Sequence, residues 1–325
     1  MRRWPALLSI AACHHTTPLA KEQLASAFVD SLCTYKVACG EFPDSASCHR
    51  AYLGVAFFVE STRFAAIDAG KIVYDGIAAR DCMDAIATTL CDRTSQSARV
   101  TAEACDHIVA GTLHVGAPCT LDEECISLTC SIPIMTMQCS VGQCMGDTAP
   151  SRQLIGGSCA NKNACAAGGY CDINSTTCVA LVARGGTCTQ DFQCAYGNGC
   201  VNGACAPLPV IGQACTTECR DDATACSTGK QCVKLGLPGA PCATRADCSP
   251  YYTCDAGGHC AEGSSQGGPC MMNNDCFDAS YCGPAMTCAP PQADGATCVD
   301  DRDCTSSHCD CTATPATCTS LPMCV

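Results

Sequence analysis

The chain is poor in the side chains that build a large hydrophobic core. Its 325 residues include one Trp, eight Tyr and seven Phe, so aromatic residues make up 5% of the total. The hydrophobic fraction of 47% is inflated because it counts 38 cysteines. A chain this short of bulky apolar groups cannot stabilise one extended core by burial alone. The scarcity argues against a large cytosolic enzyme with a Rossmann or barrel core.

Basic residues and long apolar runs are also scarce. The chain has 18 Lys and Arg against 31 Asp and Glu, which gives a formal net charge of −13. A surface of that sign repels phosphate groups, so we expect no nucleic-acid partner. No segment after the N-terminal leader is long and apolar enough for a transmembrane helix, which needs about 20 residues.

Cysteine is what the chain has in excess. The 38 cysteines exceed the roughly 8–10% that marks a disulfide scaffold. So many thiols do not suit a reducing cytosol, and the composition therefore indicates an exported protein in an oxidising compartment.

Residues 1–12 have the features of an export signal. Arg2 and Arg3 form a basic start, and a short apolar stretch follows. The end of that stretch, Ile10-Ala11-Ala12-Cys13, resembles a bacterial lipobox, which implies lipidation of Cys13 as the first mature residue. Membrane association is then expected only through this lipid. The alternative is an ordinary signal cleaved nearby, with Cys13 as one more thiol.

Residues 13–112 predict a helical domain held together by disulfides. Thr17-Pro18 predicts a helix start, and apolar residues from Leu24 onward recur at helical spacing. Further helices are predicted after residue 44, over about 75–90, and from about residue 101. Six cysteines allow three disulfides among 15 pairings, and the sequence does not choose among them: Cys33, Cys39, Cys48, Cys82, Cys91 and Cys105.

The remaining two thirds of the chain form a repeat array. The motif G-x-x-C occurs seven times, at Gly116, Gly156, Gly185, Gly212, Gly239, Gly267 and Gly295. Most repeats continue as C-x5-C-x5-C-x4–6-C, and this register divides the array into a first irregular module (113–155), five four-cysteine modules (156–294) and a terminal six-cysteine module (295–325). The glycine is expected to supply a turn with positive φ at each junction.

Each repeat is too short to bury enough surface to offset its ordering entropy, so disulfides replace a core. If they join the first cysteine to the third and the second to the fourth, each closes a loop of about 12 residues and contributes roughly 3 kcal/mol. We expect an elongated string of modules that touch mainly their neighbours. Representative candidate disulfide cysteines are Cys188, Cys194, Cys200, Cys205, Cys242, Cys248, Cys254, Cys260, Cys270, Cys276, Cys282 and Cys288.

Without Cys13 the cysteine count is odd. Either one thiol lacks an intramolecular partner, or Cys13 is not lipidated and completes the set. The simplest location for the surplus is the first block, which has five cysteines: Cys119, Cys125, Cys130, Cys139 and Cys144.

The sequence points to no metal, cofactor or catalytic site. Cys309-Asp310-Cys311 beside His308 could suggest a metal, but zinc sites favour C-x2–4-C pairs and oxidised cysteines cannot ligate as thiolates. No P-loop, H-E-x-x-H or G-x-S-x-G motif occurs. A triad could still assemble from scattered residues, because triads are recognised by geometry. We therefore expect no enzyme, with an active site in the helical domain as the minor alternative.

Two further features have open interpretations. An acidic residue precedes the second cysteine in five repeats, which favours a solvated acidic face over weak calcium sites: Glu124, Glu218, Asp247, Asp275 and Asp303. Tyr251, Tyr252 and Phe192 are either exposed ligand contacts or covers over their own disulfides, and the sequence favours neither.

Repeats such as 185–205 and 239–260 resemble Dickkopf N-terminal cysteine-rich and epidermal-growth-factor-like modules. With the lipobox and the helical cysteine domain, the whole chain resembles bacterial cysteine-rich envelope lipoproteins. The resemblance implies a small disulfide-rich fold in which a disulfide-stapled α-helical domain precedes tandem modules with little regular secondary structure. No receptor-binding residue of Dickkopf proteins can be matched to this chain.

These observations predict a non-enzymatic protein of the cell envelope or extracellular space. The array is expected to serve binding, adhesion or spacing, with an extracellular protein or glycan as partner. The alternative is a secreted cysteine-rich regulator, such as a receptor ligand or protease inhibitor.

Overall fold

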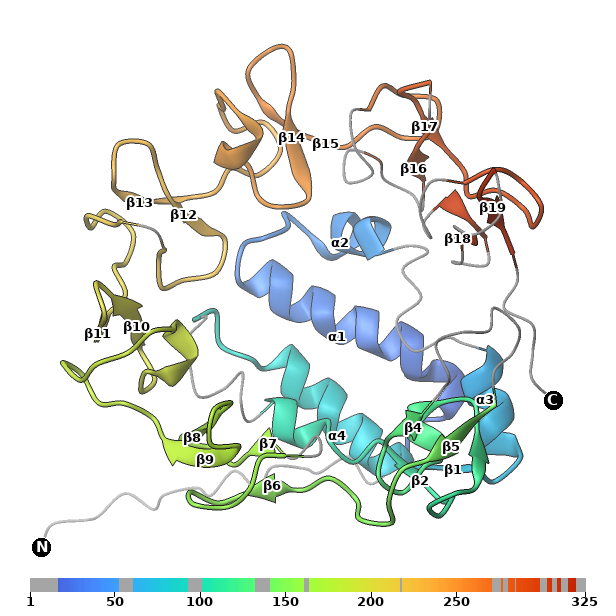
Figure 1. The fold of residues 1–325 in the computed structure, drawn as a ribbon. Helices are drawn as coiled ribbons and strands as arrows, with labels where there is room; N and C mark the ends of the chain where they lie inside the picture. The colour runs from blue at the N-terminus through green and yellow to red at the C-terminus, as the bar shows by residue number, and fades with distance from the viewer. Residues whose placement is uncertain are drawn as a thin grey trace, which may run out of the picture.

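The computed structural model describes residues 17–52, 61–92, 101–131, 141–160, 164–216, 218–270, 276, 280–283, 285–298, 303–305, 309–310 and 315–319. Sixteen disulfides join cysteines in these ranges, helices precede many short strands, and regular structure is sparse (Figure 1). The predicted small disulfide-rich fold with tandem modules is confirmed.

The helical domain, here called the hub, comes first. Its helices are α1 (Leu24–Ala38), α2 (Ser45–Tyr52), α3 (Ser61–Asp68) and α4 (Gly76–Ala87). A short 3-10 turn, η1 (Lys21–Gln23), leads into α1, and the strands β1 (Ile72–Tyr74) and β2 (Val109–Gly111) pair antiparallel. Three disulfides tie these elements together: Cys33–Cys48, Cys39–Cys91 and Cys82–Cys105.

The predicted helix start at Thr17-Pro18 is wrong. The first helical turn begins at Lys21, after Ala20 in an extended conformation. The reason is Leu19, which is buried between α1 and α4 and donates its backbone N–H to the carbonyl of Gly76 (2.8 Å). The preceding residues therefore run along the hub as extended chain, because burying Leu19 outweighs the local preference for a cap.

The array consists of seven modules, numbered 1 to 7 and bounded by their first and fourth cysteines, with Cys139 and Cys311 left out of this count: 119–144, 159–178, 188–205, 215–232, 242–260, 270–288 and 298–318. Most of them are built on one antiparallel pair of strands. The strands are β3 (Pro118–Cys119), β4 (Cys130–Ser131), β5 (Gly142–Cys144), β6 (Arg152–Gln153), β7 (Ala164–Cys165), β8 (Gly169–Asp172), β9 (Thr177–Ala180), β10 (Asn198–Val201), β11 (Ala204–Pro207), β12 (Thr224–Cys226), β13 (Cys232–Lys234), β14 (Tyr252–Cys254), β15 (Cys260–Glu262), β16 (Tyr281–Cys282), β17 (Cys288–Ala289), β18 (Cys309–Asp310) and β19 (Thr317–Cys318).

The disulfides in modules 1 to 6 join first to third and second to fourth cysteine. The pairs are 119–130 and 125–144, 159–171 and 165–178, 188–200 and 194–205, 215–226 and 219–232, 242–254 and 248–260, and 270–282 and 276–288. Module 1 is therefore a regular module with a longer third loop, and module 4 keeps the pairing despite its altered spacing. In module 7, Cys304 bonds to Cys318. Cys139, Cys311 and Cys324 lie outside the described residues.

A glycine turn fixes the fourth cysteine of every module. All seven G-x-x-C glycines have φ between 79° and 92°, the region that favours glycine. Each sits third in a four-residue turn closed by an N–H to carbonyl hydrogen bond of 2.8–3.1 Å, the pattern of a type II turn. The glycine N–H donates to the carbonyl of the fourth cysteine, and that cysteine's N–H donates to the carbonyl of the residue after the glycine. The predicted positive-φ junction turn is thus present in every module.

The stretch before a module is hydrogen-bonded through its backbone to the module that follows it. In modules 1 to 5 and 7, the carbonyl of the residue six positions before the first cysteine accepts from the residue after the second cysteine: 113 from 126, 153 from 166, 182 from 195, 209 from 220, 236 from 249 and 292 from 305. Each of these stretches is therefore fixed against the module that follows it. It orients the next module and does not act as a flexible linker.

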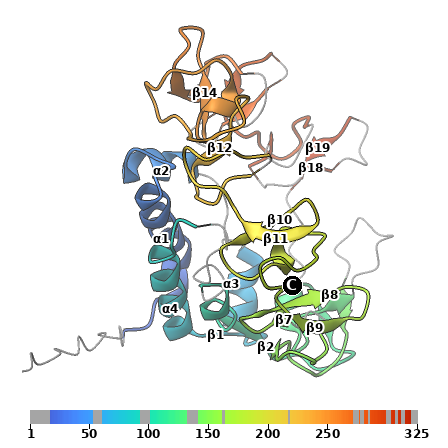
Figure 2. The ribbon, with the colours of Figure 1, turned by 90° about the vertical axis from the view of Figure 1, so that its left-hand side faces the viewer.

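The expected elongated string of modules is wrong, because the array curls around the hub. Figure 1 shows modules 1 to 7 encircling α1, α2 and α4, and Figure 2 shows them running alongside the helices. Specific contacts dock four modules: Arg63–Glu123 (2.6 Å) for module 1, Arg152–Asp106 (2.5 Å) beside module 2, Tyr35–Asp222 for module 4 and Arg50–Glu262 for module 5. No such contact is described between the hub and module 6 or 7.

Module 5 makes the largest apolar contact with the hub. Phe42, which is 1% exposed, packs against Tyr251 with ring centroids 4.6 Å apart and against Tyr252 at 5.9 Å. The hydroxyl of Ser249 donates to the carbonyl of Glu41 (2.8 Å) within this buried contact. Much of the little aromatic surface that the chain has is therefore used to hold the array against the hub, and not inside a module.

None of the helices in the described ranges is both long enough and apolar enough to cross a bilayer.

We predict that Gly185→Ala destabilises the array because alanine must adopt φ +85°. The cost of that conformation is about 1–2 kcal/mol, which lowers the thermal unfolding midpoint by roughly 2–6 °C. Gly229→Ala is the matched control, since an added Cβ there meets only ordinary contacts. Calorimetry under oxidising conditions measures both variants. Equal midpoints for the two would contradict the role assigned to the turn.

Candidate functional site

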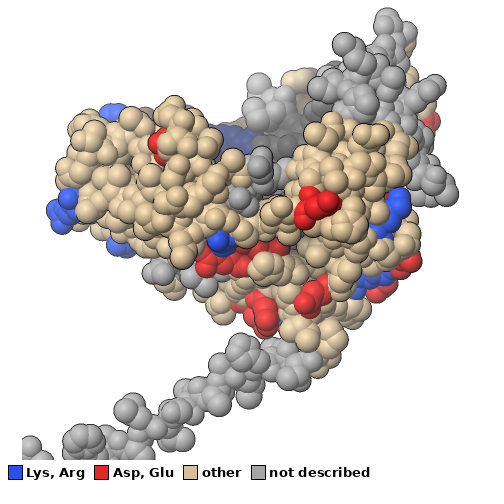
Figure 3. All heavy atoms as spheres, turned by 60° about the horizontal axis from the view of Figure 1, so that its bottom comes forward, with Lys and Arg blue, Asp and Glu red and all other residues tan. Residues whose placement is uncertain are grey.

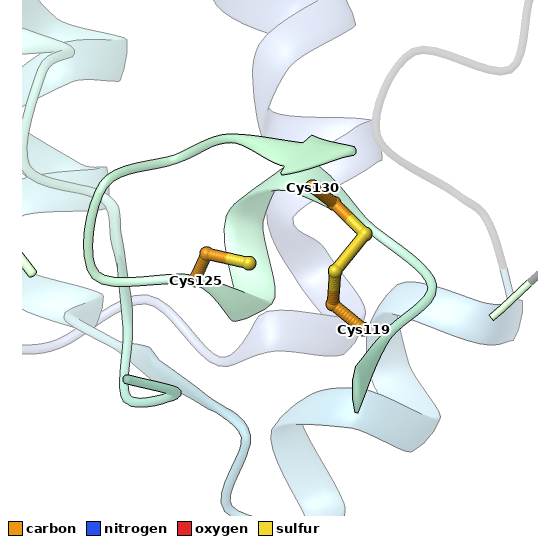
Figure 4. A group of neighbouring side chains, drawn as sticks. All are labelled: Cys119, Cys125 and Cys130. Atoms are coloured by element: carbon orange, nitrogen blue, oxygen red, sulfur yellow. A yellow bond between two sulfur atoms is a disulfide. The ribbon is translucent and has the colours of Figure 1, made fainter. Parts of the chain in front are cut away.

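The clusters of cysteine sulfurs are disulfides and not ligand sets. Three sulfurs of Cys119, Cys125 and Cys130 lie within 4.8 Å of one another, and modules 2 to 5 hold similar groups. Figure 4 shows that Cys119 and Cys130 are joined by a disulfide, while Cys125 bonds to Cys144. The sulfurs are close because two disulfides cross in each module. Without a thiolate, these atoms cannot coordinate a metal strongly.

The acidic residue before the second cysteine has a structural role. Asp247 accepts the backbone N–H of Ala243 (2.9 Å) and Thr244 (2.8 Å), and these bonds lower the pKa of its carboxyl. Glu124 is 1% exposed and accepts the N–H of Thr120 (2.7 Å) in the same way. The side chain acts as a cap for the loop between the first two cysteines.

The expectation of a solvated acidic face is wrong for Glu124 and Asp303, which are buried, whereas Asp247 is exposed as expected. Asp303 is 4% exposed, and the neutral Gln193 of module 3 makes the same bonds to Thr189 and Gln190. Because the Gln193 amide makes these bonds in module 3, the cap needs an acceptor oxygen and does not require a charge. In module 1 the carboxylate of Glu124 also pairs with Lys71 (3.3 Å). Glu218 is exposed, and Asp275 lies outside the described residues.

Ser45, His49 and Asp30 resemble a catalytic triad in outline. His49 Nε2 lies 2.7 Å from Asp30 Oδ1, and Nδ1 lies 3.1 Å from Ser45 Oγ. However, Nδ1 also lies 2.7 Å from the carbonyl oxygen of Ser45, which can only accept a hydrogen. With both ring nitrogens donating, His49 has no acceptor for the Ser45 proton. The hydrogen bond to Asp30, followed by that to Ser45, raises the pKa of His49. Because a general base needs an acceptor nitrogen, His49 cannot play that role here. The cluster is a charged contact between α1 and α2, here called the clasp.

The structure distinguishes which of Tyr251, Tyr252 and Phe192 are exposed and which are buried. Tyr252 is 1% exposed and packs on the hub, so it is not a surface contact. Phe192 is 49% exposed and meets Tyr170 edge-on across modules 2 and 3, with ring centroids 5.9 Å apart. Of these aromatics, Phe192 is the one that a partner can reach.

The tips of the junction turns form a repeated display surface, and they are the candidate binding site. The residue before each junction glycine is exposed, and its identity varies from module to module: Val115, Ile155, Arg184, Ile211, Pro238, Gln266 and Asp294. Three of these tips are branched aliphatic side chains that are 54–61% exposed. Sequence reasoning missed them, although the second position of a G-x-x-C turn could have been located by counting back one residue from each glycine.

Charge is distributed unevenly over one face of the molecule. Most of the face in Figure 3 is uncharged, and its Asp and Glu side chains gather toward the middle and one edge.

Comparison with known proteins gives one match. The Dickkopf N-terminal cysteine-rich region matches residues 158–206, which cover modules 2 and 3. No curated protein and no solved structure matches the chain. Together with the disulfides, the match identifies an extracellular cysteine-rich protein with repeated modules. Cys13, the candidate lipidation site, lies outside the described residues.

We predict that Asp30→Asn lowers the pKa of His49 toward its ordinary value of 6.5. Since the folded chain binds this proton more tightly, the clasp stabilises fully below that value and its contribution disappears as pH rises through the raised pKa. The contact is largely exposed, so we expect only about 0.2–1 kcal/mol. An NMR titration of His49 checks the shift. Asp81→Asn is the control for charge, and an equal shift in that variant would contradict the clasp.

Proposed function

We propose that this chain is a non-enzymatic binding protein of the cell envelope, held at the membrane by a lipid on Cys13. In this proposal the hub fixes the array close to its anchor, and the exposed turn tips contact an extracellular protein or glycan. The runner-up function is a secreted cysteine-rich regulator, which differs in lacking the lipid.

The proposal rests on one observation: the junction turns share a backbone conformation, while the exposed residue before the glycine differs between modules. All seven junction turns have one backbone conformation, yet the exposed residue ranges from aliphatic to acidic. A purely mechanical spacer needs the turn but has no use for three exposed branched aliphatic tips. Such side chains contribute to affinity when a partner buries their apolar surface.

Rigidity supports the same function. The disulfides, the glycine turns and the paired junctions hold the tips before any partner arrives, so little conformational entropy is lost on binding. No cofactor is part of the proposal, and the triad-like cluster at His49 lacks the base that an enzyme would need.

We predict that Val115→Ser, Ile155→Ser and Ile211→Ser together weaken binding to cells by about tenfold or more. The purified fluorescent chain is titrated on whole cells that were untreated, protease-treated or glycosidase-treated, with flow cytometry as readout. The two treatments separate a protein partner from a glycan. The matched control is Val73→Ser, Ile77→Ser and Leu90→Ser, which removes exposed aliphatic residues from the hub. Equal losses of cell binding in both triple variants would contradict the proposal that the turn tips contact the partner.

The lipid anchor has its own test. Mass spectrometry of the N-terminus is expected to show a diacylated Cys13 in the membrane fraction, and Cys13→Ser is expected to move the protein to the soluble fraction. A wild-type chain that is soluble and cleaved elsewhere would favour the secreted regulator.

A further inference from the structure

The described chain starts at one end of the hub, against the first turn of α4. The N–H of Leu19 donates to the carbonyl of Gly76 (2.8 Å), and the carbonyl of Leu19 accepts the hydroxyl of Tyr74 (3.1 Å). A Cβ built on Gly76 would stand 2.9 Å from the Cβ of Pro18. Figure 1 shows that α3, β1 and β2 lie at this same end of α1. The backbone therefore leaves the hub at a defined place.

This place limits how far the hub can stand from the proposed lipid. Three residues, 14–16, separate Cys13 from Thr17. A fully extended chain spans at most about 3.6 Å per residue, so the four steps from Cys13 to Thr17 cover about 14 Å at most. A lipid on Cys13 holds that residue at the membrane surface. The end of the hub that carries Pro18 and Gly76 is then close to the same surface.

The residues beside the chain start are apolar and exposed. Ile77, which follows Gly76 in the first turn of α4, is 50% exposed. Pro18 and Ala20 are exposed on either side of the buried Leu19. Pro18, Ala20 and Ile77, here called the foot, are thus the direct neighbours of the two residues that the Leu19–Gly76 hydrogen bond joins. Apolar surface at this position gains free energy when it is removed from water.

Charged residues around the foot limit its depth and select the kind of membrane. Asp81 is exposed one turn beyond Ile77 on the same side of α4, so the contact is confined to the start of that helix. Lys21 pairs with Asp68 and lies 4.0 Å from the exposed Glu22. Acidic groups are in excess among these described charges. They favour a surface of net-neutral lipid headgroups over an anionic one.

We propose that the foot rests on a membrane of net-neutral lipids and gives the hub a fixed orientation there. The inference rests on the proposed lipid at Cys13 and adds a contact made by the protein itself. A short tether alone lets the hub turn, whereas an apolar contact beside the tether favours one orientation. The tether also makes the contact intramolecular, so a small apolar surface is sufficient. The same modules then face away from the membrane in every molecule.

The test places a single tryptophan in the foot. Trp4 is the only tryptophan of the chain and is lost with the signal, so Ile77→Trp gives the mature chain one fluorophore. The lipidated chain is incorporated into phosphatidylcholine vesicles, with and without lipids brominated in their acyl chains. We expect the emission maximum to shift to the blue by about 10 nm and roughly half of the emission to be quenched, because interfacial apolar residues reach the acyl boundary.

Leu90→Trp is the matched control. Leu90 is 62% exposed and follows the other end of α4, whose 12 residues extend over about 18 Å. Its tryptophan is expected to keep an aqueous emission in the same vesicles. Equal quenching of both variants, or of neither, in a chain that floats with the vesicles would overturn the foot and leave the lipid anchor intact. A chain that carries no lipid and does not float would overturn the anchor, and the foot with it.

A second comparison removes the tether. In a Cys13→Ser background, Ile77→Trp is expected to lose both the blue shift and the quenching, because the foot alone is too small to hold the chain at a membrane. A response of the same size without the lipid would contradict the inference, since the contact would not need the anchor. For the same reason, Ile77→Ser in the hub triple variant is expected to leave cell binding by the unlipidated chain unchanged.

Discussion

The structure depends on how tightly each fourth cysteine is held. Its sulfur bonds to the second cysteine, its N–H and carbonyl bond to the junction turn, and the turn exists because glycine accepts a positive φ. These three constraints meet at one residue, so a module of 18–26 residues is ordered without an apolar core. Everything that a larger domain obtains from packing is here obtained from covalent and backbone geometry.

The hub determines how the modules are arranged in space. Modules that are rigid alone would still form a chain of arbitrary curvature, but modules 1, 2, 4 and 5 each contact the hub at a specific place. The few aromatic residues are concentrated at one such contact, between Phe42 and the tyrosines of module 5. Burial therefore decides the arrangement of the modules, while disulfides decide the structure within each of them.

The sequence predicted what repeats and missed what does not. The G-x-x-C register foretold the positive φ at seven junctions, and the cysteine spacing matched the crossed pairing. The contacts with the hub depend on single residues such as Asp222 and Tyr252, which occur once and have no periodic signal. The role of Asp247 was missed because a capping acid and a solvated acid look alike in sequence, until Gln193 at the equivalent place shows that charge is dispensable. The start of α1 was misplaced because the burial of Leu19 is a tertiary effect that a capping rule cannot include.

The paired junctions also define the piece of chain that evolution can copy or delete. Because residue 182 bonds to module 3 and residue 209 bonds to module 4, removing 182–208 would rejoin the backbone in register. Between modules 1 and 5, however, such a deletion would bring the wrong module to each hub surface. After module 5, no contact with the hub is described that would restrict the number of modules. Lineages carrying this architecture should therefore vary in length at the C-terminal end, while the first five modules stay fixed in number.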